Sequence, residues 1–169
     1  MGGGVILLGI MAIIVPEGYM VIALHGIIQL FSNTTRSILF RDHINWKITQ
    51  NFFIGAVVGL ITSGFIIYTL VILFNVKSAS QIKFDMLKPM IGVFIIWYLF
   101  FKNKKKESSN KSFVWVGGVS GVSAVFIGAT GPLIAPFFLN DKLSKNNIIA
   151  SKAICQVVSH VGKIPIFIY

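Results

Sequence analysis

Acidic side chains are scarce in this sequence, which has 5 Asp and Glu residues against 15 Lys and Arg in 169 positions. Charged residues of either sign make up 12% of the chain and apolar residues 55%, whereas a soluble domain is about 25% charged and about 45–50% apolar. A soluble fold of this length needs a polar surface, and the sequence has too few polar residues to supply one. We therefore expect lipid to cover much of the protein.

The groups that most enzymes use for chemistry are also missing. The sequence has no paired acidic residues, no His-x-x-x-His and no Gly-x-Ser-x-Gly motif, and its one cysteine, Cys155, has no partner for a disulfide or a metal cluster. These absences speak against a nucleophile with its base and against a metal centre. We expect a protein that is not an enzyme and that holds no cofactor and no metal.

The net charge of +10 has a simpler explanation than nucleic-acid binding. A nucleic-acid-binding surface spreads Lys and Arg over a face of a soluble fold, whereas here they lie between apolar runs, so no nucleic-acid partner is expected. Cationic loops orient a membrane protein with those loops in the cytoplasm. The basic segment 102–111 is therefore predicted to face the cytoplasm, and the alternation of helices places the polar loop from Arg41 to Gln50 on the same side.

Apolar segments separated by polar turns predict an all-α, polytopic transmembrane helical bundle. Crossing about 30 Å of hydrocarbon takes roughly 20 apolar residues. The first run, Val5 to Val15, is shorter than this, so it is either a half-helix after a glycine break or a helix whose first residues precede Met1. The later segments cover Glu17 to Phe40, Asn51 to Phe74, Met86 to Phe101, Ser112 to Asn140 and Asn146 to Tyr169.

Two segments show signs of broken helices. Glycine loosens the helical backbone and proline removes a donor, and irregular backbone at membrane depth persists only inside protein or beside a cavity. A simple kink packed against neighbouring helices is the alternative interpretation. The expected breaks are Gly3 and Gly4 at the start of the first run, and Gly128, Gly131 and Pro132 in the segment that begins at Ser112.

An internal repeat appears when the sequence is shifted by 127 positions. Matched glutamines and cations inside membrane helices are harder to explain by composition than matched apolar residues. Repeated halves with interrupted helices point to a secondary transporter whose site lies between the halves, which are left open as parallel or inverted. The matched pairs are Gly4 with Gly131, His25 with Lys152, Gln29 with Gln156, Ser32 with Ser159, Asn33 with His160 and Arg36 with Lys163.

The glycine triplet from Gly2 to Gly4, the polar helix with Gln29, and the second copy from Gly128 to Pro136 followed by Gln156 together resemble the sulfite exporter TauE/SafE family. The resemblance spans nearly the whole chain. It implies a duplicated, multi-pass secondary transporter of the cell membrane, in a bacterium the inner membrane. It also implies export of sulfite, an organosulfonate or another small anion.

This resemblance divides the chain into three parts. Residues 1–101 are a first repeat that is incomplete at its N-terminus, with a glycine-led half-helix and about three further helices. Residues 102–111 are the basic cytoplasmic loop, and residues 112–169 are the start of a second repeat that is incomplete at its C-terminus. The implied partners are a small anionic solute and the lipid bilayer, and a homo-oligomer is left open.

A small anion in a low-dielectric site needs fixed positive charge and hydrogen-bond donors. Half-helix N-termini supply backbone N–H groups and a positive dipole end, and glutamine amides orient oxygens without adding charge. Arg36 and Lys163 are expected to supply charge toward the cytoplasmic end of the cavity. The predicted substrate-binding residues are His25, Gln29, Asn33, Arg36, Lys152, Gln156, His160 and Lys163.

Each assignment has an alternative. Arg36 and Lys163 lie near helix ends and are equally compatible with side chains that reach the membrane interface. For His25 and His160 a structural hydrogen bond is favoured over proton coupling, whereas the two matched glutamines are favoured as cavity-lining residues. For the whole protein the alternatives are a membrane channel, whose flux would not saturate, and a non-transporting membrane scaffold fragment.

Overall fold

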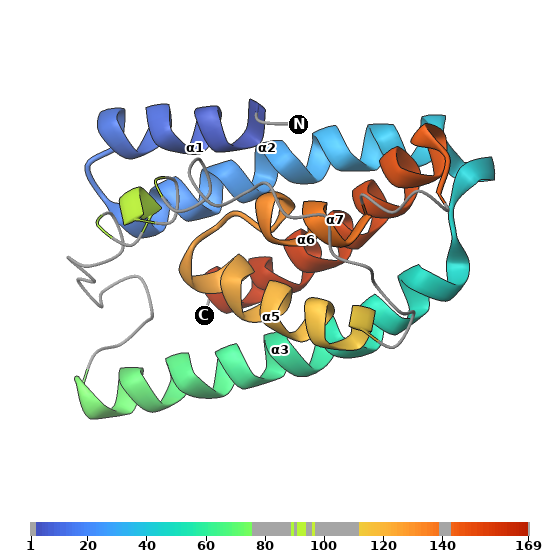
Figure 1. Cartoon of the computed structure of the whole chain (residues 1–169). Helices are drawn as coiled ribbons and strands as arrows, with labels where there is room; N and C mark the ends of the chain where they lie inside the picture. Colours follow the sequence, from blue (N-terminus) through green and yellow to red (C-terminus); the bar gives the residue numbers. More distant parts are fainter. Residues whose placement is uncertain are drawn as a thin grey trace.

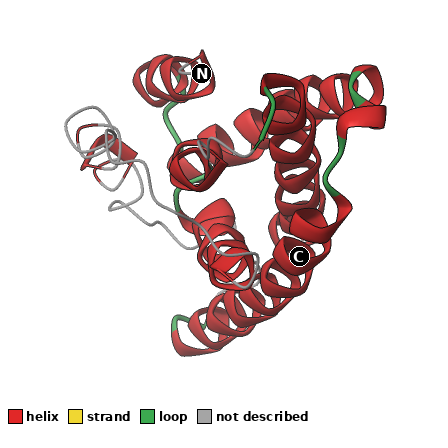
Figure 2. Ribbon diagram, turned by 45° about the vertical axis from the view of Figure 1, so that its right-hand side comes forward, coloured by secondary structure: helices red, strands yellow, loops and turns green. Residues whose placement is uncertain are grey.

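The computed structural model describes residues 3–75, 89, 91–93, 96, 112–138 and 143–168, without the side chains of 19 and 165–168. Within these ranges the chain forms helices and loops only (Figures 1 and 2), which confirms the all-α prediction. The basic loop 102–111 and most of the helix expected from Met86 to Phe101 lie outside the described residues. The elements are α1 (Gly3–Ile14), α2 (Gly18–Leu39), the 3-10 helix η1 (Arg41–His43), α3 (Trp46–Leu73), α5 (Ser112–Phe126), α6 (Gly131–Phe138) and α7 (Lys145–Ile168).

The connection between α2 and α3 is shorter than predicted. We expected a polar loop from Arg41 to Gln50, but α3 already begins at Trp46. Asn45 caps the helix, because its side-chain oxygen accepts a hydrogen bond of 3.3 Å from the backbone N–H of Ile48 and so satisfies one of the free donors at a helix start. The loop prediction was wrong because it followed polarity, and polar residues readily continue a helix beyond the apolar region.

Helix α3 has an apolar surface that suits lipid. Within the described residues it is the one helix long and apolar enough to cross a membrane, and only 22% of its most apolar window is buried in the structure. A core helix of a soluble protein would be mostly buried. Instead, Ile61, Phe65 and Leu73 are 68%, 70% and 74% exposed, so this face needs an apolar environment.

Helices α3 and α5 run side by side in the same direction with their backbones in close contact. A Cβ atom added at Gly117 would lie 2.9 Å from the backbone nitrogen of Ala56, and one at Gly121 would lie 2.6 Å from the Ala56 oxygen. Small residues at such positions allow membrane helices to approach closely. Because Gly117 also faces Phe52, near the start of α3, both helices begin at the same end of the molecule (Figure 1).

Helices α2 and α7 run antiparallel. Ser151, near the start of α7, accepts a hydrogen bond of 2.8 Å from the backbone N–H of Asn45, just beyond the end of α2. Lys163, near the other end of α7, donates one of 3.0 Å to the carbonyl oxygen of Ile22, near the start of α2. The two hairpin-like units, α1 with α2 and α6 with α7, therefore point in opposite directions, and α1 and α6 run outward toward opposite ends (Figure 1).

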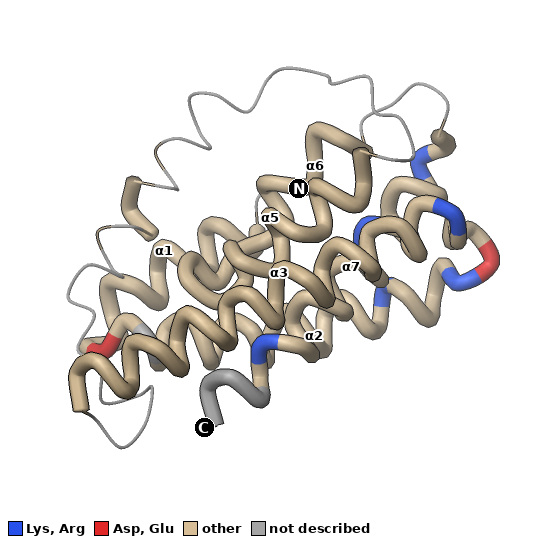
Figure 3. The backbone as a smooth tube through the Cα atoms, turned by 90° about the horizontal axis from the view of Figure 1, so that it is seen from below, with Lys and Arg blue, Asp and Glu red and all other residues tan. Residues whose placement is uncertain are grey.

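Basic residues gather at one end of the described structure. They lie in the last turn of α2, in η1, in the first turn of α3 and in the first part of α7 (Figure 3), and are Arg36, Arg41, Lys47, Lys145 and Lys152. Lys163 lies apart from them, toward the other end of α7. The end that carries η1 therefore has a concentration of positive charge.

Candidate functional site: a cavity between two helix breaks

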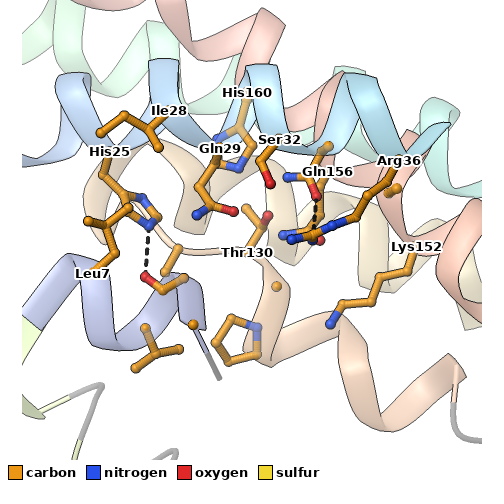
Figure 4. A pocket seen from close by; sticks show the side chains of 18 of the residues that line it. Leu7, His25, Ile28, Gln29, Ser32, Arg36, Thr130, Lys152, Gln156 and His160 are labelled. Atoms are coloured by element: carbon orange, nitrogen blue, oxygen red, sulfur yellow. Dashed lines mark hydrogen bonds between the residues drawn. The ribbon is translucent and has the colours of Figure 1, made fainter. Parts of the chain in front are cut away.

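A cavity of about 680 Å³ lies between the helices of the two units. Figure 4 shows the amides of Gln29 and Gln156 and the cationic side chains of Arg36 and Lys152 around one space. Seven of the eight predicted binding residues line it. Of the five predicted helix-break residues, all except Gly128 also line it. The lining residues are Gly3, Gly4, Val5, Leu7, His25, Ile28, Gln29, Ser32, Asn33, Arg36, Phe40, Ala129, Thr130, Gly131, Pro132, Ile149, Lys152, Ala153, Gln156 and His160.

The broken helix predicted from Ser112 to Asn140 is present as α5 and α6. Gly128 lies between them with φ +82°, a conformation that glycine adopts without the steric cost of a Cβ. The chain then turns into α6, where the carbonyl oxygen of Thr130 accepts hydrogen bonds from Leu133 and Ile134 at 3.1 and 3.2 Å. Pro132 has no N–H group, and this costs nothing in the first turn, where a backbone N–H would have no partner within the helix. The N-terminus of α6 consequently opens onto the cavity.

The same contact recurs at both half-helix N-termini. At the start of α1, a Cβ added to Gly4 would lie 3.1 Å from Nε2 of Gln29; at the start of α6, one added to Gly131 would lie 2.7 Å from Nε2 of Gln156. Each glycine thus lets an amide from the following long helix lie against the first turn of a half-helix. The two contacts are related by the shift of 127 positions that defines the sequence repeat.

Positive charge lies at one end of the cavity. Arg36 donates a hydrogen bond of 3.4 Å from Nη1 to Oδ1 of Asn33, and the charges of Arg36 and Lys152 repel each other. Among the described residues that line the cavity none is acidic. An anion placed between these two cations would relieve their repulsion.

Three residues that line the cavity carry buried polar atoms without partners. Within the part of the chain that the structure describes, Nδ2 of Asn33, Oγ1 of Thr130 and both ring nitrogens of His160 are buried without a hydrogen bond. Buried polar groups are normally paired, so these three residues have hydrogen-bonding capacity that the described part of the chain leaves unused. Thr130 was missed from the sequence, although its position directly before the half-helix Gly131–Phe138 was a usable signal.

His25 has a different environment from His160. Its Nδ1 lies 3.0 Å from the carbonyl oxygen of Gly128, and its Nε2 lies 2.9 Å from that of Gly4. The ring is 2% exposed and forms an edge-on contact with the ring of His160, with the centroids 6.3 Å apart. His25 therefore connects the break between α5 and α6 with the start of α1.

The placement predicted for Lys163 was wrong. We expected it to supply charge beside Arg36, but it is not among the residues that line the cavity. Its Nζ reaches Ile22 at the opposite end of α2, and its stem covers Gly26. The reason is the antiparallel arrangement of α2 and α7, which sends repeat-related residues to opposite ends. Ser159, the partner of the cavity-lining Ser32, bonds to the carbonyl oxygen of Cys155 instead.

Within the described ranges no group of three or more His, Cys, Asp or Glu side chains is arranged to hold a metal ion. A family model described as sulfite exporter TauE/SafE matches residues 1–169. No curated protein and no solved structure matches the chain.

Proposed function

The chain belongs to the sulfite exporter TauE/SafE family of membrane transporters, and we propose that it moves a small anion across the bilayer through the cavity between its two repeats. Sulfite or an organosulfonate is the proposed substrate class. The proposal assigns the binding role to the seven predicted residues that line the cavity and adds Thr130 and Ser32 to them.

One observation carries the proposal: two half-helix N-termini and two repeat-related amides converge on the same cavity. Helix N-termini present free N–H groups and the positive end of the helix dipole, which together favour an anion. Gln29 and Gln156 lie against these termini at Gly4 and Gly131. A sulfite or sulfonate group has three oxygens. The N–H groups of the two helix N-termini and the two amides approach from opposite directions and can bind these oxygens without a positively charged partner for every oxygen.

Charge would come mainly from Arg36. Its planar guanidinium is suited to two oxygens of one anion, and it lies at the same end of the cavity as Lys152. The buried donors that lack partners, on Asn33, Thr130 and His160, could then bind the anion as it moves deeper. In this arrangement the amides near the middle of α2 and α7 select for oxygen geometry and the cations attract the anion.

We further propose an inverted repeat with division at the basic segment 102–111. The matched contacts at Gly4 and Gly131 and the antiparallel course of α2 and α7 support this division. The protein would be a multi-pass protein of the cell membrane, and in a bacterium of the inner membrane. The basic end with η1 would face the cytoplasm, because positive loops are retained there.

Anion-dependent thermal stabilisation of the purified protein tests the binding site. A ligand at 100 times its dissociation constant adds about 2.7 kcal/mol of stability, so sulfite or methanesulfonate should raise the melting temperature. Gln156→Met should reduce this shift, because methionine has a similar unbranched shape beside Gly131 but donates no hydrogen bond. Gln50→Met, on an exposed residue outside the cavity, is the matched control. Equal shifts in wild type, Gln156→Met and Gln29→Met would show that these amides do not bind the anion.

A further inference from the structure

We propose that His25 is the proton-binding site of this transporter, so that a proton is bound together with the anion. The inference rests on the proposed function and identifies its coupling ion. It is drawn from the two carbonyl oxygens that face the His25 ring, Gly4 at 2.9 Å and Gly128 at 3.0 Å.

The geometry around His25 favours a doubly protonated ring. A carbonyl oxygen accepts hydrogen bonds and has no proton to donate, and a neutral imidazole has only one N–H. In neutral His25 the lone pair of one ring nitrogen would therefore point at an oxygen lone pair. When the neutral ring takes a proton from solvent, both nitrogens become donors, both carbonyl oxygens gain a hydrogen bond, and the ring carries one positive charge.

The two acceptors belong to different halves of the molecule. Gly4 lies in the first turn of α1, and Gly128 lies in the break before α6 with φ +82°. Protonated His25 therefore links the two helix breaks, while neutral His25 holds only one of them. Because both half-helices begin at the cavity, the proton on His25 influences how the cavity walls are held.

The charges that surround His25 make its protonation depend on an anion. From α7 it faces the ring of His160 and the side chain of Lys163. The positive charge of Lys163 opposes a second cation nearby. From the described parts of α1, α5, α6 and the connection between them it faces no ionisable side chain. An anion in the cavity offsets the positive charge. By linkage, anion binding then strengthens proton binding, and a bound proton strengthens anion binding by the same factor.

Proton uptake on anion binding tests this directly. Methanesulfonate is the probe, because it keeps one negative charge through the range of about pH 5–8 in which histidine titrates. The protein in weakly buffered detergent solution with a pH indicator should take up protons when methanesulfonate is added, approaching about one per bound anion near the middle of that range. His25→Gln should lose this uptake per bound anion. His43→Asn, at an exposed position in η1 outside the cavity, should retain it.

Histidine resonances provide a test without substitution. The sequence has 3 histidines, and His43 is exposed in η1. With ¹⁵N-labelled histidine, one buried ring should shift to the doubly protonated state when methanesulfonate is added, and its assignment to His25 follows from the loss of that signal in His25→Gln. If His25→Gln does not fold, His160→Asn and the exposed His43→Asn leave the His25 signal by elimination.

The outcomes separate the two proposals. Three outcomes would overturn the role of His25 and leave the anion site intact. Methanesulfonate could bind without proton uptake, the uptake could be retained in His25→Gln, or His25 could stay neutral when the anion binds. No binding of sulfite or methanesulfonate at all would overturn the proposed function, and this inference with it.

Discussion

The side chain of Lys163 lies directly over Gly26, with its Nζ 3.0 Å from the carbonyl oxygen of Ile22. This lysine is 1% exposed. A helix position without a side chain on α2 thus accommodates a long cationic side chain from α7. The contact joins the two long polar helices near the start of α2, because the buried ammonium group bonds to a backbone oxygen of that helix.

Gly26→Ala should therefore destabilise the protein. The added methyl would overlap the end of the Lys163 side chain and break its hydrogen bond, at a cost of about 1–3 kcal/mol. The melting temperature of purified protein measures the loss. Gly64→Ala is the control, because a Cβ there meets nothing within 4 Å and alanine is the better helix former. Equal melting temperatures for the two variants would mean that Lys163 is free to move.

A second prediction concerns the close approach of α3 and α5. Gly117→Ala should lower stability by about 1–3 kcal/mol or more, since its Cβ would meet the backbone of Phe52 and Ala56, which cannot rotate away. The neighbouring Gly118→Ala should be tolerated, because its Cβ would lie 3.6 Å from the Gly55 oxygen, an ordinary contact. Thermal unfolding of the two variants should differ clearly. If both are tolerated, the helices are not packed in this register.

Much of this arrangement follows from the sequence, and the failures have physical causes. The helix with Gln29 and the broken segment around Gly131 were predictable, because residues such as glycine, proline and intramembrane glutamine carry strong local signals. The start of α3 at Trp46 was missed because polarity marks the membrane boundary and not the helix end. The N-cap at Asn45 was a local signal that was available.

The relative direction of the repeats depends on contacts between distant residues. Identity at a shift of 127 positions is the same for parallel and inverted halves, so the sequence could not choose between them. The antiparallel pairing of α2 and α7 decided that Lys163 lies beside Ile22 and not beside Arg36. The polar residues of the sequence therefore identified most of the cavity lining. Which of these residues lies at which end of the bundle required the structure.

The glycine at the start of α6 should affect ligand binding more than stability. In Gly131→Ala the new methyl lies 2.7 Å from the amide nitrogen of Gln156 and forces that amide to move. Loss of one oriented hydrogen bond of about 1.4 kcal/mol weakens anion binding about tenfold. Gly4→Ala should have a smaller effect on Gln29, because the corresponding distance is 3.1 Å. Titration with methanesulfonate, followed by the melting temperature, measures both; a larger loss in Gly4→Ala would contradict the assignment.

The proposed orientation can be checked with single cysteines. Asp42 is exposed in η1 and Glu17 is exposed at the turn between α1 and α2, at the other end of α2. The native Cys155 is buried and gives little background. In intact cells an impermeant thiol reagent should label Glu17→Cys, and it should label Asp42→Cys only after the membrane is opened. The reverse pattern would invert the topology and contradict the positive-inside argument.

Flux of labelled methanesulfonate into proteoliposomes that contain the purified protein shows whether the cavity between Gln29 and Gln156 carries an anion. We predict flux that saturates with concentration, that falls several-fold in Gln29→Met and Gln156→Met, and that is unchanged in the exposed Gln50→Met control. Flux that rises without saturation would indicate a channel. No flux, or equal flux in all of these variants, would show that this cavity is not the path of the anion.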